Sequence, residues 1–313
     1  MELSKKIRIA YLGTPEMSAK LLEGLIENGF NIVAVVAQID KPVGRKRILM
    51  PVPTKAVAQK HNIPVYQPRK IREDYSFLEE VKPDLILCFA YGQIIPDEVI
   101  NYPKYGCLNF HGSLLPKYRG ASPIQYALMN NDEVTGVTLM EMVKEMDAGK
   151  MYAKEVIKIE KDDNYLTLSE KMISASLKLA LNNLEAYVKG ELKGEEQNEE
   201  EVTFAPPIKP KEEYISVKDD INIIVGKVRA FAPHVGAKIY LDDDLIKILK
   251  AEVYSTDVVA PLGTVIKADK EALLVQVEGG ILNIISLQKA GKLPLTHFEF
   301  LNGYQNVKES KFK

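Results

Sequence analysis

Residues 7–37 read IRIAYLGTPEMSAKLLEGLIENGFNIVAVVA, and this stretch decides the class of fold. An apolar run at 7–12 is typical of a buried strand, and it ends in Gly13-Thr14-Pro15. Residues 16–28 carry leucine and isoleucine at helical spacing, and residues 31–37 are β-branched and apolar, which predicts a second strand. A strand, a helix and a strand in this order favour a right-handed unit whose two strands are parallel.

The same alternation continues outward from this stretch as far as residue 188. Further strand-like runs are short and apolar, and they lie at 84–89, 107–110 and 136–142. Helical spacing recurs at 122–129 and, over a longer span, at 166–188. Strands that alternate with helices predict an α/β domain over residues 1–189, with a Rossmann-like, mostly parallel sheet.

The character of the chain changes after residue 188. Residues 189–201 hold six glutamates and almost nothing apolar, so we expect a solvated linker over 190–208. A helical pattern at 219–231 then precedes five β-rich runs separated by turn residues. These runs lie at 237–241, 245–254, 263–268, 272–277 and 281–287. Five short strands predict a second domain over 209–313, an OB-like β-barrel.

The composition excludes several classes of protein. The 313 residues carry a formal net charge of −2, so a nucleic-acid partner must be met by a local basic patch. The two cysteines, Cys88 and Cys107, lie outside any CxxC or Cys/His cluster, so we expect neither a disulfide nor a metal site. No apolar run approaches the ~20 residues that span a bilayer, and we find no signal-peptide pattern. We therefore expect a cytoplasmic protein without a membrane partner.

The strand at 107–110 brings two polar side chains to one place. In an open α/β sheet, ligands bind beyond the carboxyl ends of the strands, and this strand delivers Asn109 and His111 to such an end. Residues two apart on a strand point to the same face, so the amide and the imidazole should project side by side. The sequence therefore predicts a polar site at this edge of the sheet.

The residue types at this edge suit acyl transfer to an amine. That reaction needs donors facing the developing oxyanion and a group that moves the proton of the amine. Asn109 can supply an uncharged donor, and His111 can donate or move protons near neutral pH. A carboxylate is needed beside the imidazole, and Asp147 is the candidate because its turn follows the strand at 136–142. We expect that turn at the same end of the sheet.

Simpler explanations exist for each of these residues. An isolated Asn-x-His is more often a strand end with satisfied hydrogen bonds than a catalytic pair. Asp147 precedes Ala148 and Gly149, as turn-forming aspartates do. Gly13-Thr14-Pro15 is not a GxGxxG motif, so a nucleotide-phosphate site there is weakly supported. Spacing alone indicates an α/β enzyme and nothing narrower.

A longer motif is more specific. Residues 109–120 read Asn-x-His-x-Ser-Leu-Leu-Pro-x-x-Arg-Gly, which resembles the signature of the 10-formyltetrahydrofolate-dependent formyltransferases. The turn 146–149, Met-Asp-Ala-Gly, resembles the aspartate loop of that family. The resemblance implies that Asn109, His111 and Asp147 form a catalytic trio and that 10-formyltetrahydrofolate is the formyl donor, consumed as a co-substrate. It also implies two groups of folate-contacting residues: Ser113, Leu114, Leu115 and Pro116, and Leu87, Cys88, Phe89, Ala90 and Tyr91.

The resemblance covers nearly the whole chain and is closest to those family members that formylate initiator methionyl-tRNA for translation initiation. Residues 38–55 contain five basic residues and one acid, with prolines that oppose a helix. Composition alone favours a solvated loop, whereas the resemblance implies a contact with the acceptor arm of the tRNA through Arg45, Lys46 and Arg47. Met17 stands where bacterial members commonly carry an aromatic residue, which leaves open how the methionine side chain is held.

Three other functions stay open at this point. A sugar-nucleotide formyltransferase would share the site, but it needs no polybasic loop. A hydrolase that releases formate from the same folate needs no second domain for RNA. A non-catalytic folate- or RNA-binding module would not need the trio, and a turnover assay separates it from the enzymes. OB-like barrels often bind oligonucleotides, so the second domain is expected to contact the tRNA, and the protein is expected to be a monomer.

Overall fold

The computed structural model describes residues 6–44, 47–304 and 306–313. Its contacts divide the chain into two compact units. The first unit consists of residues 1–121, 135–158 and 169–206, and the second of residues 122–134, 159–168 and 207–313. Each unit therefore contains segments that are distant in sequence.

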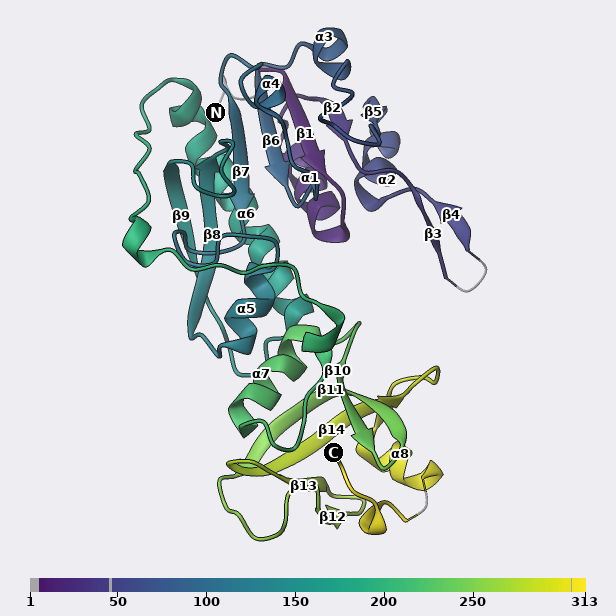
Figure 1. Ribbon diagram of the computed structural model, residues 1–313. Coiled ribbons are helices and arrows are strands. Elements are labelled where there is room, and N and C mark those ends of the chain that lie inside the picture. Colours follow the sequence, from purple (N-terminus) through teal and green to yellow (C-terminus); the bar gives the residue numbers. More distant parts are fainter. Residues whose placement is uncertain (1–5, 45–46, 305) are drawn as a thin grey trace. The chain divides into compact units, whose positions relative to one another are not determined.

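The first unit is built on a seven-stranded sheet with the order β5-β2-β1-β6-β7-β8-β9 (Figure 1). The strands are β1 (Ile9–Gly13), β2 (Ile32–Val36), β5 (Val65–Tyr66), β6 (Leu85–Phe89), β7 (Cys107–His111), β8 (Val134–Glu141) and β9 (Met151–Lys158). Neighbours from β5 to β7 are parallel, and β8 is antiparallel to β7. The predicted Rossmann-like, mostly parallel sheet is confirmed.

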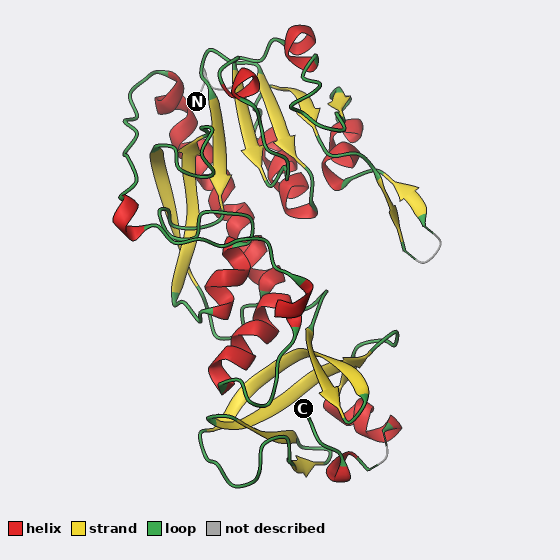
Figure 2. Cartoon of the chain, viewed as in Figure 1, coloured by secondary structure: helices red, strands yellow, loops and turns green. Residues whose placement is uncertain are grey.

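Helices pack along this sheet and bury its apolar strands (Figure 2). They are α1 (Glu16–Glu27), α2 (Pro53–Lys60), α3 (Phe77–Val81), α4 (Asp97–Ile100) and α6 (Tyr165–Val188). Phe77 of α3 and Val99 of α4 join one core cluster with alternate residues of β1, β2 and β6. Gly24 of α1 lies against Leu177 of α6, so these two helices pack together. Every residue of β1 and β6 is buried, as parallel central strands require.

The basic segment at 38–55 folds as a hairpin. Strands β3 (Lys41–Val43) and β4 (Ile48–Met50) pair antiparallel, with Lys41 opposite Met50 and Val43 opposite Ile48. The hairpin extends away from the sheet of its own unit (Figure 1). The side chains of β4 are all exposed, so periodicity gave no strand signal here.

The acidic segment that follows α6 lies along the first unit. Most of its side chains are exposed, as expected from its composition, but its backbone is anchored at two places. Glu195 forms a bridge with Met151, and Phe204 forms one with Arg119. Between them lies a short 3-10 helix, η1 (Glu199–Glu201). We call residues 195–205 the strap.

The second unit is an antiparallel sheet with the order β10-β11-β14-β13-β12, and β15 pairs with β14. Its elements are α5 (Pro123–Met129), η2 (Pro210–Glu213), α7 (Ile221–Phe231), β10 (Ala237–Leu241), β11 (Asp244–Ser255), β12 (Val265–Ala268), β13 (Leu273–Val277), β14 (Gly280–Lys289), β15 (Leu295–Thr296), α8 (His297–Gly303) and η3 (Val307–Glu309). The helix and the five strands predicted from sequence are confirmed. Phe312 forms a bridge with Leu241, the last residue of β10, and Lys311 forms one with Thr264, just before β12.

Gly226 of α7 gives a test of helix packing inside the second unit. A Cβ at this position would lie 2.7 Å from the carbonyl oxygen of Met129 on α5. Gly→Ala in a free helix stabilises by about 1 kcal/mol, but here we expect Gly226→Ala to lower the free energy of unfolding by about 1–3 kcal/mol through overpacking. Denaturant titration checks this, with Ile223→Ala on the exposed side of α7 as a control. A stabilised Gly226→Ala protein would contradict the close approach.

No helix among residues 6–44, 47–304 and 306–313 is long and apolar enough to span a membrane.

Candidate active site

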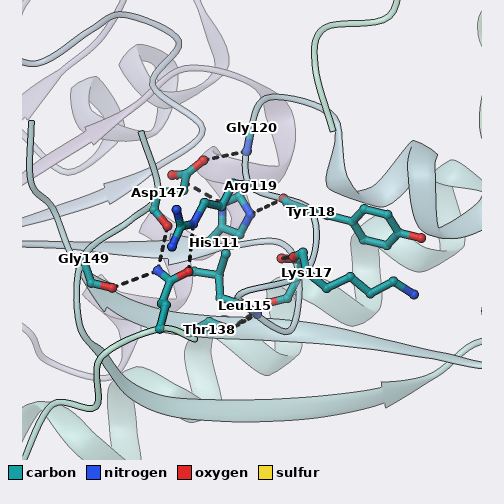
Figure 3. A network of polar contacts seen from close by, with 11 residues as sticks. His111, Leu115, Lys117, Tyr118, Arg119, Gly120, Thr138, Asp147 and Gly149 are labelled. Carbon is teal, nitrogen blue, oxygen red and sulfur yellow. Dashed lines mark hydrogen bonds and ion pairs between the residues drawn. The ribbon is translucent and has the colours of Figure 1, made fainter. Parts of the chain in front are cut away.

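Strand β7 places Asn109 and His111 as expected. His111 is buried at the end of the strand, and Asn109 is half-buried two residues earlier. The Nε2 atom of His111 lies 2.8 Å from the carbonyl oxygen of Tyr118 (Figure 3). A carbonyl can only accept, so Nε2 carries a hydrogen and donates it. The Nδ1 atom is therefore the nitrogen of His111 that is available to take up a proton.

Asp147 faces that nitrogen. Its Oδ1 lies 3.6 Å from His111 Nδ1, and its Oδ2 accepts a hydrogen bond of 2.8 Å from the Gly120 backbone N–H (Figure 3). The structure therefore brings together two residues that sequence reasoning had paired. One oxygen of the carboxylate is fixed by the backbone, which turns the other toward the imidazole.

The path of the chain to Asp147 is less direct than the order of elements suggested. Because β8 is antiparallel to β7, its last residue, Glu141, pairs with Leu108 and not with the strand end at His111. Residues 142–150 then fold back, and a Cβ on Gly149 would lie only 2.1 Å from the Glu141 carbonyl oxygen. A glycine is required there because the returning chain passes against the end of β8.

The Asn109 amide is free to act as a donor. Within the part of the chain that the structure describes, we find no hydrogen-bond partner for it, although its side chain is half-buried. Asn109 shares a face of β7 with His111 because side chains alternate along a strand. An uncommitted amide beside an imidazole can donate to an oxygen atom of a ligand.

The turn at 113–116 is held by two polar side chains from neighbouring strands. Thr138 of β8 donates from its hydroxyl to the Ser113 carbonyl at 2.7 Å and accepts from the Leu115 N–H at 3.1 Å. Lys154 of β9 donates to the Leu115 carbonyl at 2.6 Å. Sequence reasoning missed both residues. The signal that the sequence offered was a threonine, Thr138, within an apolar strand-like run.

These contacts decide which side chains of the turn a ligand can reach. Ser113 and Leu115 are buried, and the Ser113 hydroxyl donates to the Lys117 carbonyl at 2.5 Å. Leu114 and Pro116 are partly exposed. Of the four residues expected to contact folate, the structure therefore leaves two accessible from the surface.

The second predicted folate segment, residues 87–91, lies at the end of β6. Four of its side chains are buried, and Ala90 is exposed; the buried ones are Leu87, Cys88, Phe89 and Tyr91. Burial raises the pKa of the Cys88 thiol to about 12, so this cysteine stays protonated and is no nucleophile. A ligand can contact this segment through Ala90 and the peptide backbone.

The carbonyl of Tyr91 joins the ends of three strands. It accepts from the Thr14 hydroxyl at 3.1 Å and from the Gln38 side-chain amide at 3.0 Å. Thr14 follows β1 and Gln38 follows β2, so the segment after β6 is fixed to both neighbours. These carboxyl ends form the edge where an open α/β sheet binds its ligands.

Four candidates remain: the basic residues Arg45, Lys46 and Arg47, and Met17. Arg47 is exposed at the start of β4, whereas Arg45 and Lys46 lie outside the described residues. Met17 is half-buried in the first turn of α1. The expected RNA contact through the three basic residues stays a prediction.

A group-transfer enzyme is expected to have the features described above: the sheet, the strand end that carries Asn109 and His111, and the smaller β unit. A family model described as formyl transferase matches residues 5–183, and one described as formyl transferase, C-terminal domain, matches residues 207–305. The chain belongs to the formyl transferase family, and it is a formyltransferase.

Relatives of known name match almost the whole chain. A methionyl-tRNA formyltransferase from Sulfurihydrogenibium sp. is 38% identical over 311 residues, which are 98% of this chain and 100% of the relative. One from Thermotoga maritima is 37% identical over 98% of each chain. A solved N-formyltransferase from Helicobacter canadensis, in complex with folinic acid and dTDP-3-aminofucose, has a TM-score of 0.67 at 18% identity and covers 90% of this chain and 99% of its own. At that identity, the last likeness shows the fold alone.

Thr138 gives a test of how the turn at 113–116 is held. Thr138→Val keeps the shape of the side chain but leaves the Leu115 N–H and the Ser113 carbonyl without a partner. We expect the free energy of unfolding to fall by about 1–3 kcal/mol, the cost of buried unsatisfied groups. Thr256→Val, at an exposed threonine, is the control and should change it by less than about 0.5 kcal/mol. Equal effects in denaturant titrations of the two variants would contradict the role of Thr138.

Proposed function

We propose that this enzyme transfers the formyl group of 10-formyltetrahydrofolate to the α-amine of initiator methionyl-tRNA, for translation initiation. The observation that carries the proposal is the meeting of His111 and Asp147 at the end of β7, beside the free Asn109 amide. The names of the full-length relatives support methionyl-tRNA as the acceptor. The complex of the Helicobacter canadensis protein with folinic acid supports a folate as the donor.

In the first step, the amine nitrogen attacks the formyl carbon, and a new C–N bond forms. The carbonyl oxygen gains negative charge and becomes the oxyanion of a tetrahedral intermediate. The Asn109 amide donates to this oxygen. A donor that is already in place needs no reorganisation when the charge develops, which makes such contacts effective.

In the second step, the bond between the formyl carbon and the folate nitrogen breaks. His111 takes the proton that the amine loses, through Nδ1, and returns it to the departing folate nitrogen. Asp147 stabilises the imidazolium that exists between these transfers, because its Oδ1 faces Nδ1. His111 Nε2 stays bound to the Tyr118 carbonyl, which fixes the plane of the ring.

The folate contacts that we propose are the turn at 113–116 and the segment at 87–91. Leu114, Pro116 and Ala90 offer exposed atoms, and the buried members of both segments set the backbone on which these lie. We therefore assign the surface near Asn109 to the folate that donates the formyl group.

The tRNA contacts that we propose lie in the β3–β4 hairpin and in residues 209–313. Arg45, Lys46 and Arg47 are consecutive cations, and a local basic segment attracts phosphates whatever the net charge of the chain. Residues 1–189 act as the catalytic domain and residues 190–208 as the connection. We further propose that the enzyme works as a cytoplasmic monomer.

The catalytic assignment is tested by two substitutions. Asn109→Ala and His111→Ala should each lower kcat by about 10²–10³-fold, the usual loss for one transition-state contact. Formyl transfer to methionyl-tRNA is measured, with circular dichroism to check the fold. His61→Ala, a half-buried histidine paired with Glu23, is the control and should keep full turnover. A wild-type kcat for either site variant would refute the assignment.

The proposed RNA contact is tested at the hairpin. Arg45→Ala should weaken tRNA binding and flatten its salt dependence, by about one phosphate contact, while folate affinity stays unchanged. Binding of both ligands is measured at several salt concentrations. Lys60→Ala on α2, paired with Glu23, removes a charge of the same sign as a control. A change of equal size for both ligands would argue against a tRNA contact.

A further inference from the structure

We infer that Gln197 of the strap, together with Arg119, is a positioning residue that sets the direction of the Asp147 carboxylate. The inference rests on the proposed function, in which Asp147 acts on His111. Gln197 is buried, and its amide nitrogen donates to the Asp147 carbonyl at 2.7 Å and to the Gly149 carbonyl at 2.9 Å. Both hydrogens of the amide are therefore used on one turn.

This turn needs an external support. Asp147 has a φ of 52°, in the left-handed region that costs a non-glycine residue about 1–2 kcal/mol. Met146, just before it, is 65% exposed, so the turn is not held by burial of its apolar side chain. Gln197 binds the carbonyls on both sides of Ala148. Two fixed carbonyls define the backbone of Asp147, and the backbone defines where its side chain points.

Arg119 connects the same strap to the other side of the carboxylate. Its Nε donates to the Gln197 side-chain oxygen at 2.9 Å, and its terminal nitrogens donate to Glu199 at 2.7 and 3.3 Å. The next residue, Gly120, donates its N–H to Asp147 Oδ2. These contacts form one hydrogen-bond network, in which Gln197 fixes the backbone of Asp147 and Gly120 fixes its carboxylate.

The strap itself is fastened at Arg119. The Arg119 N–H donates to the Thr203 carbonyl at 2.8 Å, and the Ala205 N–H donates to the Arg119 carbonyl at 2.8 Å. Hydrogen bonding from Arg119 also holds the pKa of Glu199 below its usual value. The strap is thus bound by its backbone and its side chains to the residue that precedes Gly120.

Gln197 also has the chemistry that the position requires. It stands in an acidic segment, between Glu196 and Asn198, yet it is an uncharged amide. A glutamate there could still accept from Arg119, but it would have no hydrogen for the carbonyls of Asp147 and Gly149. The pair Gln197→Glu and Gln197→Ala therefore separates the support of Asp147 from the contact with Arg119.

The first measurement compares steady-state kinetics of formyl transfer in Gln197→Ala and Gln197→Glu with the wild type. We expect both variants to lose kcat by between about tenfold and 10²-fold, because a misplacement of about 1 Å can cost that much, with KM unchanged for folate and tRNA. Glu200→Ala, an exposed strap residue, is the control and should keep wild-type kcat. A wild-type kcat in Gln197→Glu would overturn the inference, since that variant retains the contact with Arg119.

The second measurement is a double-mutant cycle with Asp147→Asn. If Gln197 acts through Asp147, Gln197→Ala should lower kcat no further in the Asp147→Asn protein. A general loss of folding would instead add its full effect, and that result would overturn the inference. An unchanged kcat in Asp147→Asn alone would refute the part that the proposed function gives to Asp147. A low kcat in Asp147→Asn with a normal one in Gln197→Ala would refute only the role of Gln197.

Discussion

The approach of the Asp147 carboxylate to the His111 imidazole is the contact on which the rest of the site depends. Oδ1 lies 3.6 Å from Nδ1, while the Gly120 N–H binds Oδ2. Three segments must meet to produce it: the end of β7, the segment containing Gly120 shortly after it in the chain, and the loop between β8 and β9. The sheet supplies the first, and hydrogen bonds outside the sheet supply the other two.

This arrangement explains why so many of the site residues are buried and already bonded. His111 is 5% exposed and Ser113 is fully buried, so each is held by the protein before a ligand arrives. Fixed dipoles in a partly dry site act more strongly on developing charge than mobile water does. As a consequence, few side-chain atoms of these residues are left to contact a ligand. The half-buried Asn109 amide is one of them.

Much of the fold followed from the sequence. The apolar pattern of the sequence located the central strands of both units because those strands are buried along their whole length. It failed for the β3–β4 hairpin, whose β4 side chains are exposed, and it did not reveal that the acidic strap is anchored. The strap is held by Gln197 and by backbone bridges. A charge-rich composition gives no sign of either.

The candidate site followed from the sequence less completely. The motif placed Asn109, His111 and Asp147 correctly in one region, but it gave no account of what aligns them. Gln197 holds the turn that contains Asp147, and Thr138 holds the turn at 113–116, each through two hydrogen bonds to the backbone. Such contacts join segments that are far apart in the chain and leave no local pattern. Only a three-dimensional structure reveals them.

The identity of the acceptor is the central claim, because the chemistry of the site suits any primary amine. One measurement tests it most directly: a competition with 10-formyltetrahydrofolate carrying a labelled formyl group, initiator methionyl-tRNA and a dTDP-amino sugar in one mixture. We predict that the label moves to the α-amine of the esterified methionine, while the sugar stays unmodified and no formate is released. Transfer of the label to the sugar amine, or its release as formate, at a comparable rate would contradict the account.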